Sequence, residues 1–317
     1  MTWPILDFLL HGDRASPRCA ASAGRKRINV TDEHFALSAP RQTTAPVTAE
    51  SQFDFGRAAA ALTDAAARAG AAIMAHYHEG PEVKFKDDLS PVTRADHDAE
   101  AIILAALKKL APDIPVVSEE ASSGEEPELG ARFFLVDPLD GTKEFIQKRS
   151  DFTVNIALIV DGRPRFGLVY APARSLLAIT VAEDKAVEAE LAPNESGADL
   201  AKLTCRPLRV RVPAPEGFVA VVSHSHLDAE TETFLAKLKI AKRSSAGSSL
   251  KFLLVARGEA DVYPRFGPTM EWDIAAGQVV LEAAGGTVVD AEGAPLRYGK
   301  REAGLRNPSF IAWGRRE

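Results

Sequence analysis

The chain has 317 residues, enough for one large domain or two smaller ones with substantial cores, and it is 46% hydrophobic and 26% charged. A formal net charge of −6 argues against a general nucleic-acid-binding protein, which normally presents a basic face. Two cysteines, Cys19 and Cys205, are too few for a disulfide framework or a cysteine-based metal site. No run of residues reaches the apolar length of a membrane span. We therefore expect a cytoplasmic protein without stable membrane insertion and without a nucleic-acid partner.

The first 50 residues differ in pattern from the rest of the chain. Residues 5–10 form a short apolar patch, and residues 14–27 are rich in arginine, serine and alanine. In a secretory signal the charges precede the apolar run, whereas here they follow it. A transit peptide and a start codon placed too far upstream are the alternatives to a disordered segment. We interpret residues 1–50 as a disordered N-terminal extension.

Two helices are predicted at the start of the remaining chain. Residues 53–78 are alanine-rich with apolar residues at helical spacing, and a Gly-Pro pair ends this pattern. Residues 84–89 are polar and predict a hairpin or loop. The second helix is predicted over residues 98–110, and Asp96 fits the N-cap position before it.

The most informative stretch is DPLDGT, residues 137–142, which follows the apolar run FFLV. The apolar run predicts a buried strand, and Pro138 is expected to stop it. Asp, Pro and Gly within one short window then predict a turn. Such a turn can place Asp137 and Asp140 on the same side, with the Leu139 carbonyl between them. Three hard oxygen donors in so small a volume suit Mg²⁺ or Ca²⁺ rather than Zn²⁺.

Gly141 and Thr142 are predicted to open a short helix over residues 143–148, whose free backbone N–H groups could hold a phosphate oxygen. Taken alone, the pattern is also that of a solvated strand–helix turn in which Asp bonds its own backbone.

Two other acidic sites favour a functional interpretation of this turn. Glu119 and Glu120 follow a short apolar run, and Asp273 stands at the mouth of an apolar helix predicted over residues 272–284. Each acid therefore lies at the end of a core element, where a site at the edge of a sheet would be built.

The rest of the chain changes type in its second half. Antiparallel strands are predicted at residues 151–160, 165–171 and 176–181. Further strands are predicted at residues 218–222, 241–245, 261–263 and 287–289, alternating with helices at residues 228–238, 248–256 and 272–284. This alternation indicates layered α/β packing. Residues 192–201 lack a core pattern, so we divide the chain into an α+β metal-binding half, residues 51–204, and an α/β substrate-binding half, residues 205–317.

Polar residues of the second half are candidates for substrate binding. His224 lies just beyond a predicted strand, where alternating side chains could line a pocket or be solvated. Ser248 and Lys251 lie near one face of a helix start, which suits a second phosphate, although a lysine on an exposed helix face is equally ordinary. Arg265 beside Tyr263 combines a guanidinium fork that suits phosphate with an aromatic surface.

The run DPLDGTKEF, the upstream SEE and the downstream WDIAAG resemble the inositol monophosphatase superfamily of Mg²⁺-dependent phosphatases. The resemblance implies a layered α-β-α-β-α sandwich of the inositol monophosphatase/fructose-1,6-bisphosphatase type. It also implies two or three Mg²⁺ ions, held by Glu119, Asp137, the Leu139 carbonyl, Asp140 and Asp273. Glu119 is chosen over Glu120 because the family's ligand is the first acid of the pair.

The same resemblance implies catalytic and substrate-binding roles. Thr142, paired with Asp96, would orient and activate the attacking water, with Glu119 as the third catalytic residue. The backbone N–H groups of Gly141 and Thr142 would grip the phosphate. The residues that would contact substrate are Leu139, Asp140, Gly141, Thr142, His224, Ser248, Lys251, Arg265 and Asp273.

The stretches FTVNIALIVDGRPRFGLVYAP and AGSSLKFLLVARGEADVYPRFGPTMEWD and the ending LRNPSF are similar to one branch of this superfamily, the CysQ-type 3′(2′),5′-bisphosphate nucleotidases. The similarity implies removal of the 3′-phosphate from adenosine 3′,5′-bisphosphate, with 3′-phosphoadenosine 5′-phosphosulfate as a second candidate substrate. An inositol monophosphatase or another small sugar-phosphate phosphatase is the alternative. An inactive anion- or nucleotide-binding protein is a further one, which the full set of acids disfavours. The oligomeric state is left open.

Overall fold

The computed structural model describes residues 53–316 apart from 81–82, 86–90, 122–128, 194–195 and 226–227. The chain divides into two units at Asp54/Phe55, and every element below belongs to the second unit, Phe55–Glu317. The extension predicted at residues 1–50 lies outside the described residues. Within the described ranges, none of the helices combines the length and the apolar character that a bilayer crossing requires.

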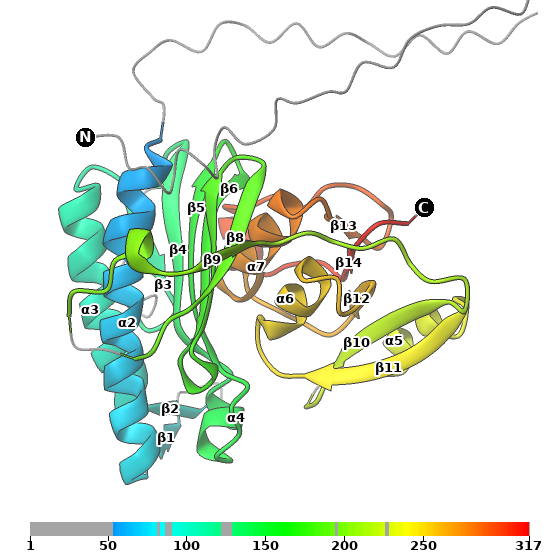
Figure 1. The fold of residues 1–317 in the computed structure, drawn as a ribbon, viewed down its shortest axis with the longest axis horizontal. Coiled ribbons are helices and arrows are strands. Elements are labelled where there is room, and N and C mark those ends of the chain that lie inside the picture. The colour runs from blue at the N-terminus through cyan, green and yellow to red at the C-terminus, as the bar shows by residue number, and fades with distance from the viewer. Residues whose placement is uncertain are drawn as a thin grey trace, which may run out of the picture. The chain divides into compact units, whose positions relative to one another are not determined.

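The first half of the second unit is a seven-stranded sheet covered on one face by two long helices (Figure 1). Its strands run in the order β3-β4-β5-β6-β7-β8-β9, and only β3 and β4 are parallel. The strands are β3 (Val116–Ser118), β4 (Arg132–Asp140), β5 (Thr153–Val160), β6 (Arg163–Ala171), β7 (Leu176–Ala182), β8 (Lys185–Glu190) and β9 (Cys205–Pro207). The covering helices are α2 (Phe55–Glu79) and α3 (Arg94–Leu110).

Short elements complete this half. A two-stranded ribbon pairs β1 (Val83–Phe85) with β2 (Pro91–Thr93), and the five-residue helix α4 (Thr142–Ile146) follows β4 directly. Single 3₁₀ turns occur at η2 (Pro172–Arg174), η3 (Leu200–Lys202) and, in the second half, η4 (Arg301–Ala303).

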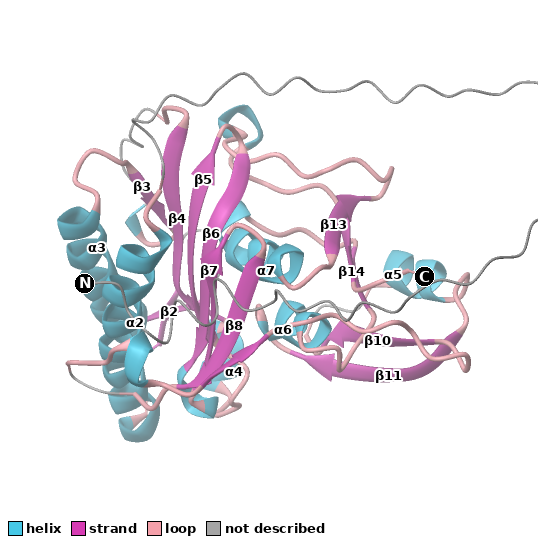
Figure 2. Ribbon diagram, turned by 45° about the horizontal axis from the view of Figure 1, so that its top comes forward, coloured by secondary structure: helices cyan, strands magenta, loops and turns pink. Residues whose placement is uncertain are grey.

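The second half adds a five-stranded sheet in the order β11-β10-β12-β14-β13. Its strands are β10 (Phe218–Ser223), β11 (Ile240–Ala246), β12 (Val262–Arg265), β13 (Thr287–Asp290) and β14 (Phe310–Trp313). Helices α6 (Leu250–Ala256) and α7 (Glu271–Ala283) lie between the two sheets, and α5 (Ala229–Leu235) covers the outer face (Figure 2). The predicted α-β-α-β-α layering is confirmed.

Helix α7 is buried on nearly all sides because it packs against both sheets. It lies so close to β6 that a Cβ atom placed on Gly167 would stand 2.4 Å from Val279 Cγ1 and 2.7 Å from the Ala276 carbonyl oxygen. The absence of a side chain at this position therefore sets the spacing between the sheet and the helix that carries Asp273.

Two local predictions were wrong, and some strands were missed. Pro138 does not stop the central strand: β4 continues to Asp140 through a bulge, where a proline without an N–H is tolerated. Helix α3 begins at Arg94, and its N-cap is Thr93 rather than Asp96, which stands at the third helical position and closes a capping box. Strands β8, β9 and β14 were not predicted, and β9 still pairs with the first sheet although it begins at Cys205. The division of the chain into two functional halves stays a prediction.

The contact at Gly167 gives a test of this packing. We expect Gly167→Ala to lower the free energy of unfolding by about 1–3 kcal/mol, because the methyl group must displace helix backbone as well as a side chain. Gly130→Ala is the matched control, since among the described residues no heavy atom beyond its chain neighbours lies within 4 Å of the position that its Cβ would take. Denaturant unfolding of both variants measures the difference. Equal stabilities would show that α7 can move away from β6 at little cost.

Candidate active site

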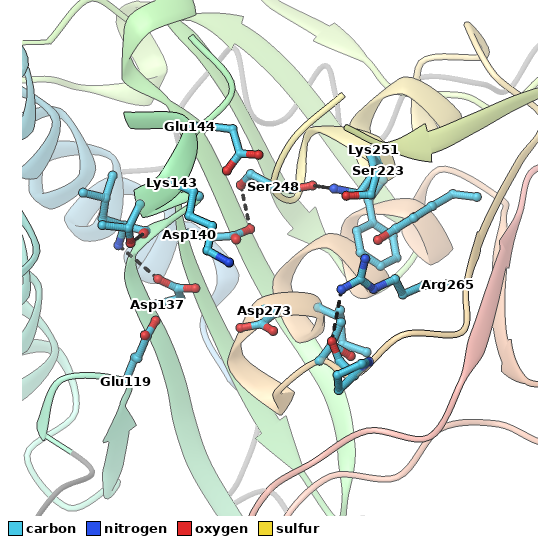
Figure 3. A pocket seen from close by; sticks show the side chains of 18 residues that line it. Glu119, Asp137, Asp140, Lys143, Glu144, Ser223, Ser248, Lys251, Arg265 and Asp273 are labelled. Carbon is cyan, nitrogen blue, oxygen red and sulfur yellow. Dashed lines mark hydrogen bonds between the residues drawn. The ribbon is translucent and has the colours of Figure 1, made fainter. Parts of the chain in front are cut away.

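A cavity of about 240 Å³ opens where the ends of β3 and β4 face α6, α7 and β12. Among its lining residues are the acids Glu119 after β3, Asp137 and Asp140 on β4, and Asp273 in the first turn of α7 (Figure 3). Leu139, Gly141 and Thr142 also line it. The fold therefore brings together the acids that are far apart in the sequence.

The bulge in β4 determines how its two acids are presented. Asp137 lies opposite Asn155 on β5 and Asp140 lies opposite Thr153, so that β4 contains one residue more than β5 between these pairs. The Asp137 carboxylate accepts a hydrogen bond from the backbone N–H of Leu139 at 3.0 Å. In place of the predicted turn, a strand irregularity delivers both carboxylates to the same cavity.

Asp140 is held by groups from the second half of the chain. Its Oδ2 accepts hydrogen bonds from Ser248 Oγ at 2.6 Å, from Ser249 N at 2.8 Å and from Asn155 Nδ2 at 3.3 Å. Burial raises the pKa of Asp140, while the nearby Lys251 ammonium and these hydrogen bonds act in the opposite direction. The carboxylate is thus fixed before any ligand binds.

Asp273 is held from the C-terminal side of the chain. Its Oδ2 accepts from Met270 N at 2.7 Å, and the Met270 carbonyl accepts from Asn307 Nδ2 at 2.6 Å. Glu271, which follows Met270, is fully buried. Its carboxylate accepts hydrogen bonds from Lys300 Nζ at 2.7 Å and from Lys300 N at 2.9 Å. Residues 299–307 therefore anchor the start of α7 and, through it, the Asp273 carboxylate.

The acids are buried close to one another and repel one another. Burial raises the pKa of Asp137 well above its ordinary value, and the neighbouring Glu119, Asp140 and Asp273 add to the effect. Burial and Asp140 likewise raise the pKa of Asp273 well above its ordinary value. In the described part of the chain, no three Asp, Glu, His or Cys side chains converge into a ready-made metal cluster. The donor set nevertheless fits a hard divalent cation, because it contains only oxygen atoms and gathers negative charge that a cation would offset.

Thr142 lies beside these acids at the first position of α4. Its Oγ1 is 3.3 Å from Asp96 Oδ1 and 3.2 Å from the Leu139 carbonyl oxygen, so it can donate to either. Asp96 Oδ2 accepts from Thr93 N at 2.8 Å and from Thr93 Oγ1 at 2.7 Å. Burial raises the pKa of Asp96, with the capping hydrogen bonds opposing it. The predicted Thr142–Asp96 pair is therefore present in the structure.

Two cations face the acids across the cavity (Figure 3). Lys251 on α6 is only 5% exposed; its Nζ donates to the Ser248 carbonyl at 2.6 Å and lies 5.2 Å from the Tyr263 ring centre. Burial lowers the pKa of Lys251 to about 8, with Asp140 opposing the shift. Arg265, at the end of β12, is 8% exposed and donates to the Pro268 carbonyl at 3.1 Å. An exposed position for Lys251, left open by the sequence, is thereby excluded.

The remaining candidate, His224, has a different setting. Its Nε2 lies 3.4 Å from Asp151 Oδ2, and among the described residues it does not belong to the cavity wall. The wall also includes residues that sequence reasoning did not single out, among them Lys143, Glu144 and Thr269. Lys143 and Glu144 directly follow DPLDGT, and that adjacency was the available signal. Glu144 is buried and accepts from Ser225 Oγ at 2.6 Å.

Known proteins resemble this chain over most of its length. Residues 57–313 match the inositol monophosphatase family. The 3′(2′),5′-bisphosphate nucleotidase CysQ of Shigella flexneri is 48% identical over 248 residues, which cover 77% of this chain and 95% of the relative. The protein of the same name from Escherichia coli K12 is 46% identical with the same coverage. A crystal structure of CysQ from Bacteroides thetaiotaomicron is 40% identical, with a TM-score of 0.66 over 81% of this chain and 97% of that one. The chain belongs to the inositol monophosphatase family.

Proposed function

We propose that this protein is a cytoplasmic 3′(2′),5′-bisphosphate nucleotidase that uses Mg²⁺ to remove the 3′-phosphate of adenosine 3′,5′-bisphosphate, giving AMP and phosphate. The observation that carries the proposal is the polarity of the cavity, with acids on one wall and Lys251 and Arg265 on the other. A substrate with two phosphates fits this division, because one phosphate can meet the acidic wall through metal ions and the other can meet the cations directly. Relatives at 45–48% identity carry the name of this activity.

Phosphatases of this family are generally metal-dependent, and the oxygen donors of the acidic wall suit Mg²⁺. Two or three ions would be held by Glu119, Asp137, the Leu139 carbonyl, Asp140 and Asp273. Bound Mg²⁺ would neutralise charge on the phosphoryl oxygens and favour a nucleophilic water. The serine contacts to Asp140 and the Met270 contact to Asp273 keep these carboxylates oriented in the absence of substrate.

Thr142 and Asp96 would accept the proton that the attacking water releases. The Thr142 hydroxyl can donate to Asp96 and at the same time accept a hydrogen bond from water with its free lone pair. As the water attacks phosphorus, its proton would pass to Thr142 while the Thr142 proton passes to Asp96. The backbone N–H groups of Gly141 and Thr142, which open α4 at the cavity wall, would bind a phosphoryl oxygen.

The second wall would select the nucleotide. Lys251 and Arg265 are both buried, so a phosphate that reaches them makes charge-assisted hydrogen bonds with little screening by water. Ser248 would support this wall through its carbonyl, which accepts from Lys251. His224 would contact the nucleotide only by leaving its position beside Asp151.

The direct test is phosphate release from purified protein with adenosine 3′,5′-bisphosphate, 3′-phosphoadenosine 5′-phosphosulfate, inositol monophosphate and fructose bisphosphate. We expect the highest kcat/KM for the adenosine bisphosphate. A clear preference for inositol monophosphate would replace this proposal by a general small-phosphate phosphatase, which requires only the acidic wall. The absence of Mg²⁺-dependent release from every substrate would indicate a binding protein.

Removing one acid should abolish most of the activity without unfolding the protein. We expect Asp140→Asn to reduce kcat/KM by at least about 100-fold, because a metal ligand contributes several kcal/mol to the transition state. Asp161→Asn, in the turn between β5 and β6, is the matched control and should behave as the wild type. Activity of the wild type should also vanish in excess chelator. Full turnover under chelation would disprove metal dependence.

Removing one cation should affect bisphosphate substrates selectively. A charge-assisted contact contributes about 1.5–3 kcal/mol, so we expect Lys251→Met or Arg265→Met to lower kcat/KM for adenosine 3′,5′-bisphosphate roughly 10- to 150-fold. Inositol monophosphate should be largely unaffected, because it does not reach these residues. Lys242→Met, an exposed lysine on β11, is the control. Equal losses on both substrates would mean that the cations support the fold and not the second phosphate.

The lowered pKa of Lys251 predicts a pH effect of defined sign. The Lys251 ammonium carries its charge below a pKa of about 8 and loses it above. We therefore expect the ratio of kcat/KM for the bisphosphate to kcat/KM for inositol monophosphate to fall as the pH rises through about 8. Titration of the shared acids cancels in this ratio. Lys251→Met should give a ratio that does not vary in this range, and a falling ratio in that variant would assign the titration to another group.

A further inference from the structure

Asp151 lies outside the cavity wall but connects both halves of the chain. Its side chain is 8% exposed and precedes β5 by two residues. One carboxylate oxygen pairs with Arg174 Nη2 at the end of η2. The other accepts from the backbone N–H of Gly247 at 3.0 Å and lies 3.4 Å from His224 Nε2. A single buried carboxylate thus joins the first sheet to the segment between β11 and α6.

The backbone around Asp151 is packed without free space. A Cβ atom on Gly247 would stand 2.8 Å from the Asp151 carbonyl oxygen and 2.9 Å from the Asp151 Cβ. A Cβ atom on Gly141 would stand 2.9 Å from the same carbonyl oxygen. Asp151 therefore lies between the glycine that follows Asp140 and the glycine that precedes Ser248. Asp151 thus contacts both the segment that carries Asp140 and the segment whose serines donate to Asp140.

The residues after Gly247 transmit this contact to Asp140. Ser248 Oγ and Ser249 N donate to Asp140 Oδ2 at 2.6 Å and 2.8 Å. Ser249 Oγ also donates to the Asp273 carbonyl at 2.7 Å. Ser248 has a φ of 54°, a left-handed conformation that costs a serine free energy and persists only where the surroundings impose it. The hydrogen bond from Gly247 to Asp151, one residue earlier, supplies such a constraint.

We propose that Asp151 is a positioning residue for the metal-binding acid Asp140: it clamps residues 247–249 to the first sheet, so that Ser248 and Ser249 hold the Asp140 carboxylate in its binding orientation. The inference rests on the proposed function only for the role of Asp140 as a metal ligand. Arg174 completes the clamp by neutralising the Asp151 charge and fixing its orientation. Partners of this kind, which orient a ligand without touching the metal, commonly change metal affinity or activity about 10- to 100-fold when they are removed.

The alternative is that Asp151 and Arg174 form an ion pair that only stabilises the fold. The two interpretations differ in what a conservative change at Asp151 does to Mg²⁺ binding. A purely structural pair would lower the unfolding midpoint and leave the Mg²⁺ affinity of the folded protein unchanged. A positioning residue would weaken Mg²⁺ binding in protein that is fully folded, and its effect would depend on Ser248.

The experiment compares Asp151→Asn with Asp184→Asn, the same chemical change at an exposed residue in the turn between β7 and β8. Mg²⁺ affinity is measured by calorimetry on the full chain without substrate, and folding is checked by circular dichroism and thermal unfolding. We expect Asp151→Asn to weaken Mg²⁺ binding about 10- to 100-fold and Asp184→Asn to bind as the wild type does. Equal Mg²⁺ affinities in the two variants would overturn the proposal.

A double-mutant cycle tests whether Asp151 acts through Ser248 and Ser249, which we call the serine segment. If Asp151 acts through Ser248 and Ser249, Asp151→Asn should add little to the loss of Mg²⁺ affinity caused by Ser248→Ala. Losses that multiply would show that Asp151 does not act through Ser248 and would overturn the proposal. If Asp151→Asn does not fold, the Mg²⁺ affinity of Arg174→Gln is measured instead. The Arg174 side chain is 42% exposed, so its removal leaves the core intact. Unchanged Mg²⁺ affinity in Arg174→Gln would then overturn the clamp.

The readout separates this inference from the proposed function. Mg²⁺ binding is measured without a nucleotide. A wild-type protein that binds Mg²⁺ but does not hydrolyse adenosine 3′,5′-bisphosphate would refute the proposed substrate. The clamp would then still be tested by the Mg²⁺ affinities of the variants. A protein that hydrolyses the bisphosphate with the same Mg²⁺ affinity in wild type and Asp151→Asn supports the function and refutes the clamp.

Discussion

The repulsion between carboxylates gathered in one cavity is the constraint on which the rest of the site depends. Burial and mutual repulsion raise the pKa of Asp137 and of Asp273, so these acids resist ionisation unless a cation is nearby. Such groups keep a defined orientation only where other parts of the chain hold them. The bulge of β4, the serine segment and the start of α7 do this, and each fixes a different acid. A divalent cation would offset the charge that the fold has concentrated.

The two sheets contribute different groups to the cavity. Asp137 and Asp140 belong to the first sheet, whereas the donors that hold Asp140 precede α6 and the cations Lys251 and Arg265 belong to the second half. The shape of the cavity therefore depends on how the two halves are packed together. The close contact of Gly167 with α7 and the packing of Gly247 against Asp151 maintain that packing. Stability of the interface and geometry of the acids are thus properties of the same contacts.

Burial also explains why the cationic wall differs from an ordinary basic surface. Lys251 is a buried residue of the cavity wall with its Nζ 5.2 Å from the Tyr263 ring centre, and burial lowers its pKa. A charge in this position is costly unless a partner approaches it. An anionic group of a substrate would remove that cost, so under the proposed function Lys251 would respond to a second phosphate. An exposed lysine, already hydrated, would discriminate much less.

The sequence by itself indicated layered α/β packing and the two long helices through local periodicity, and its DPLDGT and WDIAAG motifs, through their resemblance to the family, indicated the acids that line the cavity. It could not determine that β4 continues through Pro138, since the bulge depends on pairing with β5. Residue patterns alone could not decide whether Glu119 or Glu120 faces the cavity, or whether Lys251 is exposed. The structure places Glu119 on the cavity wall and buries Lys251. The role of Asp151 had no local signal at all. Its partners Arg174, His224 and Gly247 are separated from it by 23 to 96 positions, and contacts at such separations are decided only when the two sheets pack together.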